Sequence, residues 1–158
     1  MKPSLYLETS IISYLAALPS RDLIVAAHQQ ITHEWWSQRR EMYDLFVSDL
    51  VIQEVRRGDT SAAERRMDVL RGLKRLVING QVRSLVKDFI QECCLPARAK
   101  EDTVHVALAA VHGMDYLLTW NCKHIANSLT RQKVTDSCRS HGLKAPIIST
   151  PEELPEEE

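Results

Sequence analysis

The sequence predicts a single α/β domain in which helices cover both faces of a parallel sheet. Short runs rich in aliphatic and β-branched residues alternate along the whole chain with segments whose apolar residues recur at helical spacing. The composition, 44% hydrophobic and 26% charged residues, is that of an ordinary globular protein. A length of 158 residues suits one domain with a sizeable core and is short for two. Disordered, collagen-like and coiled-coil architectures are therefore disfavoured.

Five short apolar runs are typical of strands, and polar or turn-forming residues separate each of them from the next helix. These runs span residues 5–7, 45–47, 76–78, 116–119 and 147–148. Because the runs alternate with helical segments, the strands are expected to be parallel. Their carboxyl ends and the beginnings of the following helices would then share one edge of the sheet, which is where ligands bind in such folds.

Helices are expected in the intervals between the strands. The hydroxyls of Thr9 and Ser10 are good N-caps for a first helix that Pro19 ends, and Ser20 is the expected N-cap of the second. Further helices are expected to carry residues 51–55 and to run over residues 61–72, 82–94, 99–112 and 122–142.

The charge of the chain is unevenly distributed. Twenty basic and 21 acidic residues give a net charge of −1, but residues 152–158 contain five glutamates and no basic residue. Without them, 20 basic residues face 16 acidic ones, a net charge of +4. We therefore expect one domain over residues 1–151 and a solvated acidic C-terminal tail over residues 152–158. The modestly positive body is compatible with a nucleic-acid partner.

Several classes of protein lack support in the sequence. There is no membrane-spanning apolar segment and no signal peptide, so a cytoplasmic location with reduced cysteines is expected. Phosphate-binding, dinucleotide-binding, α/β-hydrolase and zinc-protease motifs are also missing. Cys93, Cys94, Cys122 and His124 could form a zinc site, although isolated cysteines are more often small buried apolar residues.

Four oxygen-bearing side chains fall at the predicted carboxyl edge of the sheet. Glu8 ends the first strand, Glu54 lies in the helix after the second, and Asn121 follows the fourth. Asp102 lies in the first turn of the helix before the fourth strand, which places it at the same edge. Three carboxylates and an amide suit a hard divalent cation such as Mg²⁺ or Mn²⁺. The pattern predicts a metal-dependent hydrolytic or phosphoryl-transfer site.

Each of these residues also has an ordinary structural interpretation. Glu8 could be a strand-end carboxylate that interacts with the N-terminus of the first helix, and Asp102 could act only on the helix dipole. Glu54 could be a solvated surface charge, and Asn121 could be a turn residue. His105 lies one turn beyond Asp102 on the same helix face, and His124 follows Asn121. Both histidines could serve the site or the core, and the sequence leaves these alternatives open.

The residues around these positions resemble the motifs of PIN-domain nucleases, and the VapC-type toxin-like branch in particular. The matching segments are 6–15 (YLETSIISYL), 48–55 (SDLVIQEV), 102–107 (DTVHVA), 118–121 (LTWN) and 147–154 (IISTPEEL). The resemblance implies a three-layer α/β/α sandwich, dependence on Mg²⁺ or Mn²⁺, and cleavage of single-stranded RNA by a metal-activated water. It also implies an antitoxin partner and a homodimer.

The same resemblance assigns roles to individual residues. Glu8, Glu54, Asp102 and Asn121 would be the catalytic, metal-holding positions, while Ser10 or Thr119 would hold the phosphate or a water next to the metal ligands. The chain departs from the family at Glu8, where aspartate is usual and the extra methylene moves the carboxylate by about 1.5 Å. Asn121 replaces a frequent aspartate and removes one negative charge.

These departures support one alternative to a nuclease, and a further alternative does not depend on them. The chain could be a catalytically weakened PIN-like module that binds RNA or a protein partner without cleavage. It could also be another metal-dependent phosphohydrolase that acts on small molecules.

Overall fold

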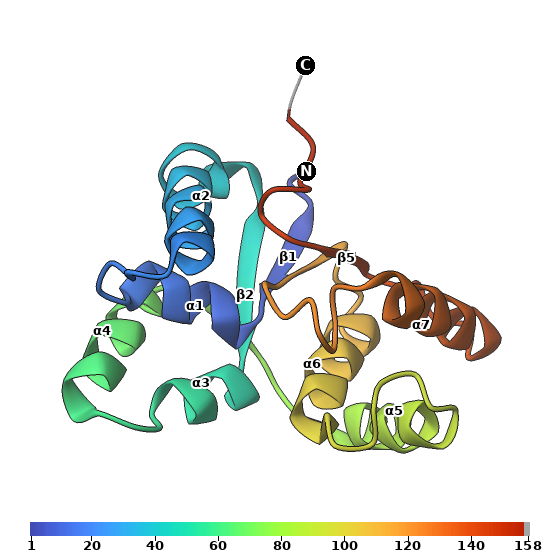
Figure 1. The fold of residues 1–158 in the computed structure, drawn as a ribbon. Helices are drawn as coiled ribbons and strands as arrows, with labels where there is room; N and C mark the ends of the chain where they lie inside the picture. Colours follow the sequence, from blue (N-terminus) through green and yellow to red (C-terminus); the bar gives the residue numbers. More distant parts are fainter. Residues whose placement is uncertain (157–158) are drawn as a thin grey trace.

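The structure is a computed structural model, which describes residues 1–156, and it contains one five-stranded, wholly parallel sheet (Figure 1). The strand order is β3-β2-β1-β4-β5. The strands are β1 (Ser4–Leu7), β2 (Asp44–Ser48), β3 (Lys74–Leu76), β4 (Tyr116–Leu118) and β5 (Ile147–Ser149). The predicted α/β class and parallel sheet are confirmed.

Seven α-helices of the described residues cover the two faces of the sheet. They are α1 (Thr9–Ala16), α2 (Leu23–Arg39), α3 (Asp49–Val55), α4 (Thr60–Val69), α5 (Gly80–Gln91), α6 (Lys100–Val111) and α7 (Ser128–Ser140), with a 3₁₀ turn at Arg40–Met42. Helices α1 to α4 lie on one side and α5 to α7 on the other, which gives three layers (Figure 1). Within residues 1–156 no helix combines the length and hydropathy that crossing a membrane requires.

The middle strand β1 sets the position of the site. Leu5, Tyr6 and Leu7 are fully buried because β1 has a paired strand on each side and a helical layer on each face. Tyr6 is aligned with Phe46 of β2, and Leu7 is aligned with Leu118 of β4. The carboxyl ends of these three strands therefore coincide, and the residues that follow them gather at one edge.

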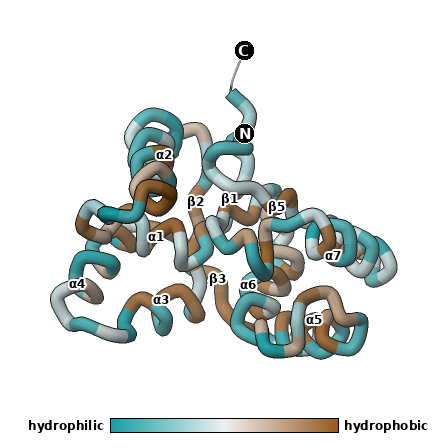
Figure 2. Tube along the Cα trace, in the orientation of Figure 1, coloured by the Kyte–Doolittle hydropathy of each residue, from teal (hydrophilic) through white to brown (hydrophobic). Residues whose placement is uncertain are grey.

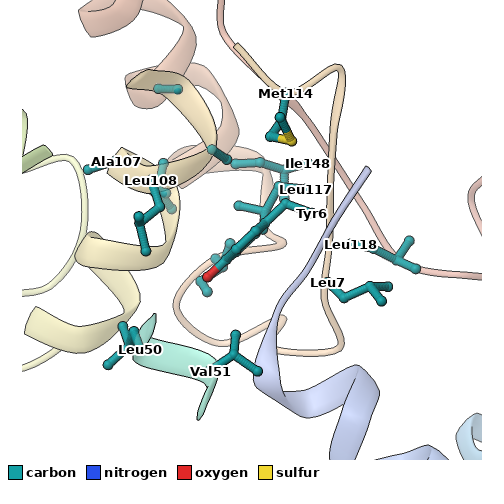
Figure 3. Close-up of a cluster of buried hydrophobic side chains, with 14 of the residues drawn as sticks. Tyr6, Leu7, Leu50, Val51, Ala107, Leu108, Met114, Leu117, Leu118 and Ile148 are labelled. Carbon is teal, nitrogen blue, oxygen red and sulfur yellow. The ribbon is translucent and has the colours of Figure 1, made fainter. Parts of the chain in front are cut away.

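Figure 2 shows apolar residues gathered along the strands, whereas the helices carry both apolar and hydrophilic residues. Figure 3 shows how α6 contributes Ala107 and Leu108 to one side of the core, while the ring of Tyr6 extends with its hydroxyl oxygen into this apolar cluster. Ala107 and Leu108 are fully buried. The small side chain of Ala107 allows α6 to approach the sheet closely. The polar groups of His105 on α6 and Tyr6 on β1 can therefore meet below the surface.

Strand β3 differs from the prediction. It occupies Lys74–Leu76 rather than residues 76–78, because Leu76 pairs with Ser48 at the end of β2. As an edge strand, β3 leaves the charged side chains of Lys74 and Arg75 exposed, where they form ion pairs with acidic residues of β2 and α3. The prediction, which rested on apolar character alone, therefore placed this strand two residues too late in the sequence.

The beginnings of two helices also differ from the prediction. Asp22, not Ser20, is the N-cap of α2, and its carboxylate accepts a hydrogen bond from Val25 N at 3.0 Å. Ser20 instead accepts a hydrogen bond from Asp22 N. Helix α7 begins at Ser128 with Asn127 as its N-cap, so residues 122–127 form a turn segment rather than helix.

The C-terminal segment remains packed against the domain as far as Leu154, beyond the expected end of the domain at residue 151. Leu154 is 3% exposed, and Glu153 accepts hydrogen bonds from Thr150 N and from the Arg131 guanidinium. The expectation of a solvated tail from residue 152 is therefore wrong for Leu154, which is buried, whereas Glu153 stays exposed and is held by an ion pair. The last two residues of the predicted tail, 157–158, lie outside the described residues.

Candidate active site

Glu8 follows β1 directly and is the N-cap of α1. Its Oε1 accepts hydrogen bonds from Ser10 N at 3.1 Å, from Ser10 Oγ at 2.5 Å and from Thr119 Oγ1 at 2.6 Å. The carboxylate, rather than a hydroxyl of Thr9 or Ser10 as predicted, therefore caps the helix. Glu8 is only 5% exposed, so these three donors stabilise a charge that lies below the surface. Ser10 and Thr119 hold Glu8 in place.

Glu54 lies in α3, and its carboxylate also accepts hydrogen bonds through Oε1. Thr9 Oγ1 lies 2.7 Å and His105 Nε2 lies 2.5 Å from this oxygen. Burial opposes ionisation, but the hydrogen bond and charge of His105, together with the hydroxyl of Thr9, lower the pKa of Glu54 to about 2. Glu54 is therefore ionised throughout the neutral pH range.

His105 lies on α6 between the first two carboxylates. Its Nε2 is 2.5 Å from Glu54 Oε1 and 4.0 Å from Glu8 Oε2, and its side chain is fully buried. Burial works against a charged imidazole, yet the hydrogen bond to Glu54 and the charges of Glu8, Glu54 and Asp102 raise the pKa of His105 above 6.5. The structure thus brings Glu8 and Glu54 together around one imidazole ring.

Asp102 and Asn121 form a second group around His124. His124 Nδ1 lies 2.9 Å from Asp102 Oδ2, and Asn121 Oδ1 accepts a hydrogen bond from His124 N at 3.0 Å. Asn121 N in turn donates to Thr119 Oγ1 at 2.9 Å, which links this group to the one around Glu8. The four predicted positions therefore share one edge but divide between two histidines, and Asn121 orients the turn that carries His124.

Two further polar side chains take part in the site. The Tyr6 hydroxyl lies 2.6 Å from His105 Nδ1 and 2.8 Å from Ser48 Oγ, and all three side chains are fully buried. Burial, reinforced by the charges of Glu8 and Glu54, raises the pKa of Tyr6 well above 10. No sequence pattern pointed to Tyr6, which stands inside an apolar strand, or to Ser48, which has the pattern of an ordinary N-cap.

An aromatic cluster borders the site on the side of α2. The His28 and Trp120 rings are stacked, with their centroids 4.0 Å apart, and the Tyr14 ring lies 6.4 Å from each. Trp120 N donates to Ser10 Oγ at 2.9 Å, and its indole N–H donates to Thr32. These contacts fix the backbone between β4 and Asn121.

The chemistry of the donors fits a hard divalent cation. Protein donors hold each carboxylate through one oxygen, namely Oε1 of Glu8, Oε1 of Glu54 and Oδ2 of Asp102. Such partners orient metal ligands in many proteins, and the remaining oxygens could contact a cation. Within residues 1–156, however, no three His, Cys, Asp or Glu side chains form a ready-made metal centre. A cation shared by Glu8, Glu54 and Asp102 would therefore require their side chains to rearrange.

The cysteines do not supply a zinc centre in the part of the chain that the structure describes. Cys93 and Cys122 are exposed, whereas Cys94 and Cys138 are buried. Cys94 lies with its thiol 3.8 Å from the Lys133 carbonyl oxygen. The alternative of a Cys/His zinc site is not supported by this arrangement.

The comparisons with known proteins agree with the fold. No protein-family model matches the chain, and no curated protein is similar to it. One solved structure to which the chain is similar is that of VapBC2 from Rickettsia felis bound to a DNA fragment from their promoter. The match has a TM-score of 0.60 and 12% identity, and it covers 92% of this chain and 97% of that chain. This likeness extends over nearly the whole chain and supports the α/β/α fold.

Proposed function

We propose that this protein is a metal-dependent endoribonuclease of the PIN type that hydrolyses phosphodiester bonds in single-stranded RNA. One observation carries the proposal: Glu8 and Glu54, which are 46 residues apart in the sequence, both approach Nε2 of His105, with Asp102 one turn earlier on the same helix. Carboxylates gathered from three elements at the carboxyl edge of a parallel sheet are typical of a ligand site rather than of local pairing.

Glu8, Glu54 and Asp102 would hold a Mg²⁺ or Mn²⁺ ion, with Asn121 at the rim of the site. The bound ion would activate a water and neutralise phosphate charge. Ser10 and Thr119 keep the Glu8 carboxylate in place, and Thr9 and His105 do the same for Glu54. Because Glu54 has a pKa of about 2, it needs no deprotonation step before it serves as a ligand at neutral pH.

We propose further that the chain acts as the toxin of a toxin–antitoxin pair and forms a homodimer. The resemblance of its motifs to VapC-type toxins supports this role, and so does its similarity in fold to a chain of the VapBC2 structure. Residues 1–151 carry a net charge of +4, which is compatible with an RNA substrate. A cation bound by the site carboxylates would neutralise part of the remaining negative charge.

A second candidate is a PIN-like module that binds RNA or a protein partner without cleavage. The engagement of Asp102 by His124, and the use of the Asn121 amide oxygen by a backbone N–H, favour this alternative. In this reading the hydrogen bonds that hold the acidic side chains stabilise the fold and do not prepare them for a cation.

Cleavage of single-stranded RNA with Mg²⁺ or Mn²⁺, measured together with calorimetric Mn²⁺ binding, distinguishes the two candidates. Glu54→Gln and Asp102→Asn should abolish cleavage and weaken Mn²⁺ binding, while the exposed-surface controls Glu64→Gln and Asp136→Asn should behave like the unmodified protein. Unchanged cleavage in both site variants would contradict the proposed mechanism. A protein that binds neither cation but still binds RNA or a partner would support the second candidate.

A further inference from the structure

A buried chain of hydrogen bonds connects the end of β2 to the Glu54 carboxylate. Val51 N lies 3.2 Å from Ser48 Oγ, which lies 2.8 Å from the Tyr6 hydroxyl. The Tyr6 hydroxyl lies 2.6 Å from His105 Nδ1, and His105 Nε2 lies 2.5 Å from Glu54 Oε1. Ser48, Tyr6 and His105 are fully buried, so their polar groups depend on one another for hydrogen bonds.

The hydrogen bond at each end of this chain has a fixed direction. At one end Val51 N–H can only donate, and at the other end the ionised Glu54 carboxylate can only accept. His105 Nε2 must therefore carry a proton that it donates to Glu54, while either partner can donate in the hydrogen bonds that Tyr6 makes to His105 and Ser48. The opposite tautomer would place an imidazole lone pair 2.5 Å from a carboxylate oxygen, which is repulsive. Glu54 thus fixes the proton on Nε2, and the Tyr6 hydroxyl holds the ring orientation of His105.

We propose that His105 is a positioning residue, which Tyr6 and Ser48 hold in the orientation that presents Glu54 to the site. Glu54 lies near the end of the seven-residue helix α3, where the backbone alone restrains its side chain poorly. Thr9 and His105, which belong to two different elements, both hydrogen-bond to Oε1 of Glu54. Together these two hydrogen bonds fix the Glu54 carboxylate. His105 also stands 4.0 Å from Glu8 Oε2, between two carboxylates that would otherwise repel each other.

The energetics argue against a purely structural role. A fully buried polar chain stabilises a core no better than well-packed apolar residues of similar volume, and it is costly if any member lacks a partner. Every link of this chain leads toward one carboxylate at the functional edge. The inference rests on the proposed function for its activity readout only, since the tautomer of His105 can be measured without RNA or metal.

Long-range ¹H–¹⁵N spectra of the full chain, without metal or RNA, provide the first test. The unmodified protein should show a proton on His105 Nε2, held against Glu54 Oε1. Tyr6→Phe removes only the hydroxyl and should shift the Nδ1 signal, while Tyr116→Phe, a control on neighbouring β4, should leave it unchanged. An unprotonated Nε2 in the unmodified protein, or a His105 spectrum insensitive to Tyr6→Phe, would overturn the proposal.

Activity variants provide the second test. Tyr6→Phe touches neither carboxylate and should lower kcat about 10-fold to 100-fold with little change in KM, as expected for loss of a partner behind a metal ligand. His105→Gln keeps an N–H donor and should retain more activity than His105→Leu at equal thermal stability. Equal activity of these two variants would overturn the positioning role. An unmodified protein that cleaves no RNA would contradict the proposed function, and the spectra would still decide the role of His105.

Discussion

Thr119 at the end of β4 donates a hydrogen bond to Glu8 at the end of β1, with 2.6 Å between Thr119 Oγ1 and Glu8 Oε1. The same hydroxyl oxygen accepts a hydrogen bond from Asn121 N at 2.9 Å. One side chain therefore ties a buried carboxylate to the turn that leads to His124. Both groups of the candidate site depend on this link between two adjacent strands.

Thr119→Val should destabilise the protein by about 1–3 kcal/mol, because Glu8 loses one of its three donors while it remains buried. Thr119→Ser keeps the hydroxyl and is the matched control. Urea denaturation of the two variants measures the difference in the free energy of unfolding. Equal urea midpoints for Thr119→Val and Thr119→Ser would show that the hydroxyl next to the buried carboxylate contributes nothing to the stability of the protein.

The stability of the protein should fall as the pH drops from about 4.5 toward 2. The pKa of Glu54 is lowered from 4.5 to about 2 in the folded chain, so the unfolded state binds the proton more readily across this interval. The contribution of Glu54 is present above its unfolded pKa and disappears as the pH falls through its folded pKa. Unfolding measured at pH 6 and pH 3 should show a smaller difference for Glu54→Gln than for the exposed-surface variant Glu64→Gln. The same change in the free energy of unfolding between pH 6 and pH 3 in both variants would contradict the lowered pKa of Glu54.

His124→Ala should weaken Mn²⁺ binding about 10-fold to 100-fold, because Asp102 loses the donor that orients it. The turn itself should persist, since backbone hydrogen bonds from Ile125 N and Ala126 N to the Asn121 carbonyl do not involve the imidazole. His33→Ala, on the exposed surface of α2, is the control for calorimetric titrations. Tighter Mn²⁺ binding by His124→Ala would instead show that the imidazole competes with the cation for Asp102.

Cys93 and Cys122 should react with iodoacetamide in the native protein, whereas Cys94 and Cys138 should not. The first two thiols are exposed, and burial raises the pKa of Cys138 to about 11, which suppresses the reactive thiolate. Mass spectrometry after brief labelling should therefore find two modified cysteines in buffer and four in concentrated urea. Rapid native labelling of Cys138 would contradict its burial in the core.

The sequence by itself determined the α/β class, the parallel sheet and most of its elements, because apolar periodicity and turn residues depend on local chemistry. It also placed Glu8, Glu54, Asp102 and Asn121 at one edge, since the topology of alternating strands and helices dictates where strands end. The edge strand β3 was misplaced because its exposed, charged residues carry no strand-like pattern, and its register comes from pairing with β2.

Only the tertiary structure decided how the polar groups at that edge are shared. His105 lies between Glu8 and Glu54, while His124 holds Asp102, and the sequence had left the role of both histidines open. The chain from Ser48 through Tyr6 to His105 joins residues 42 and 99 positions apart. Hydrogen bonds over such separations depend on the packing of β1 against α6, which no local pattern in the sequence encodes.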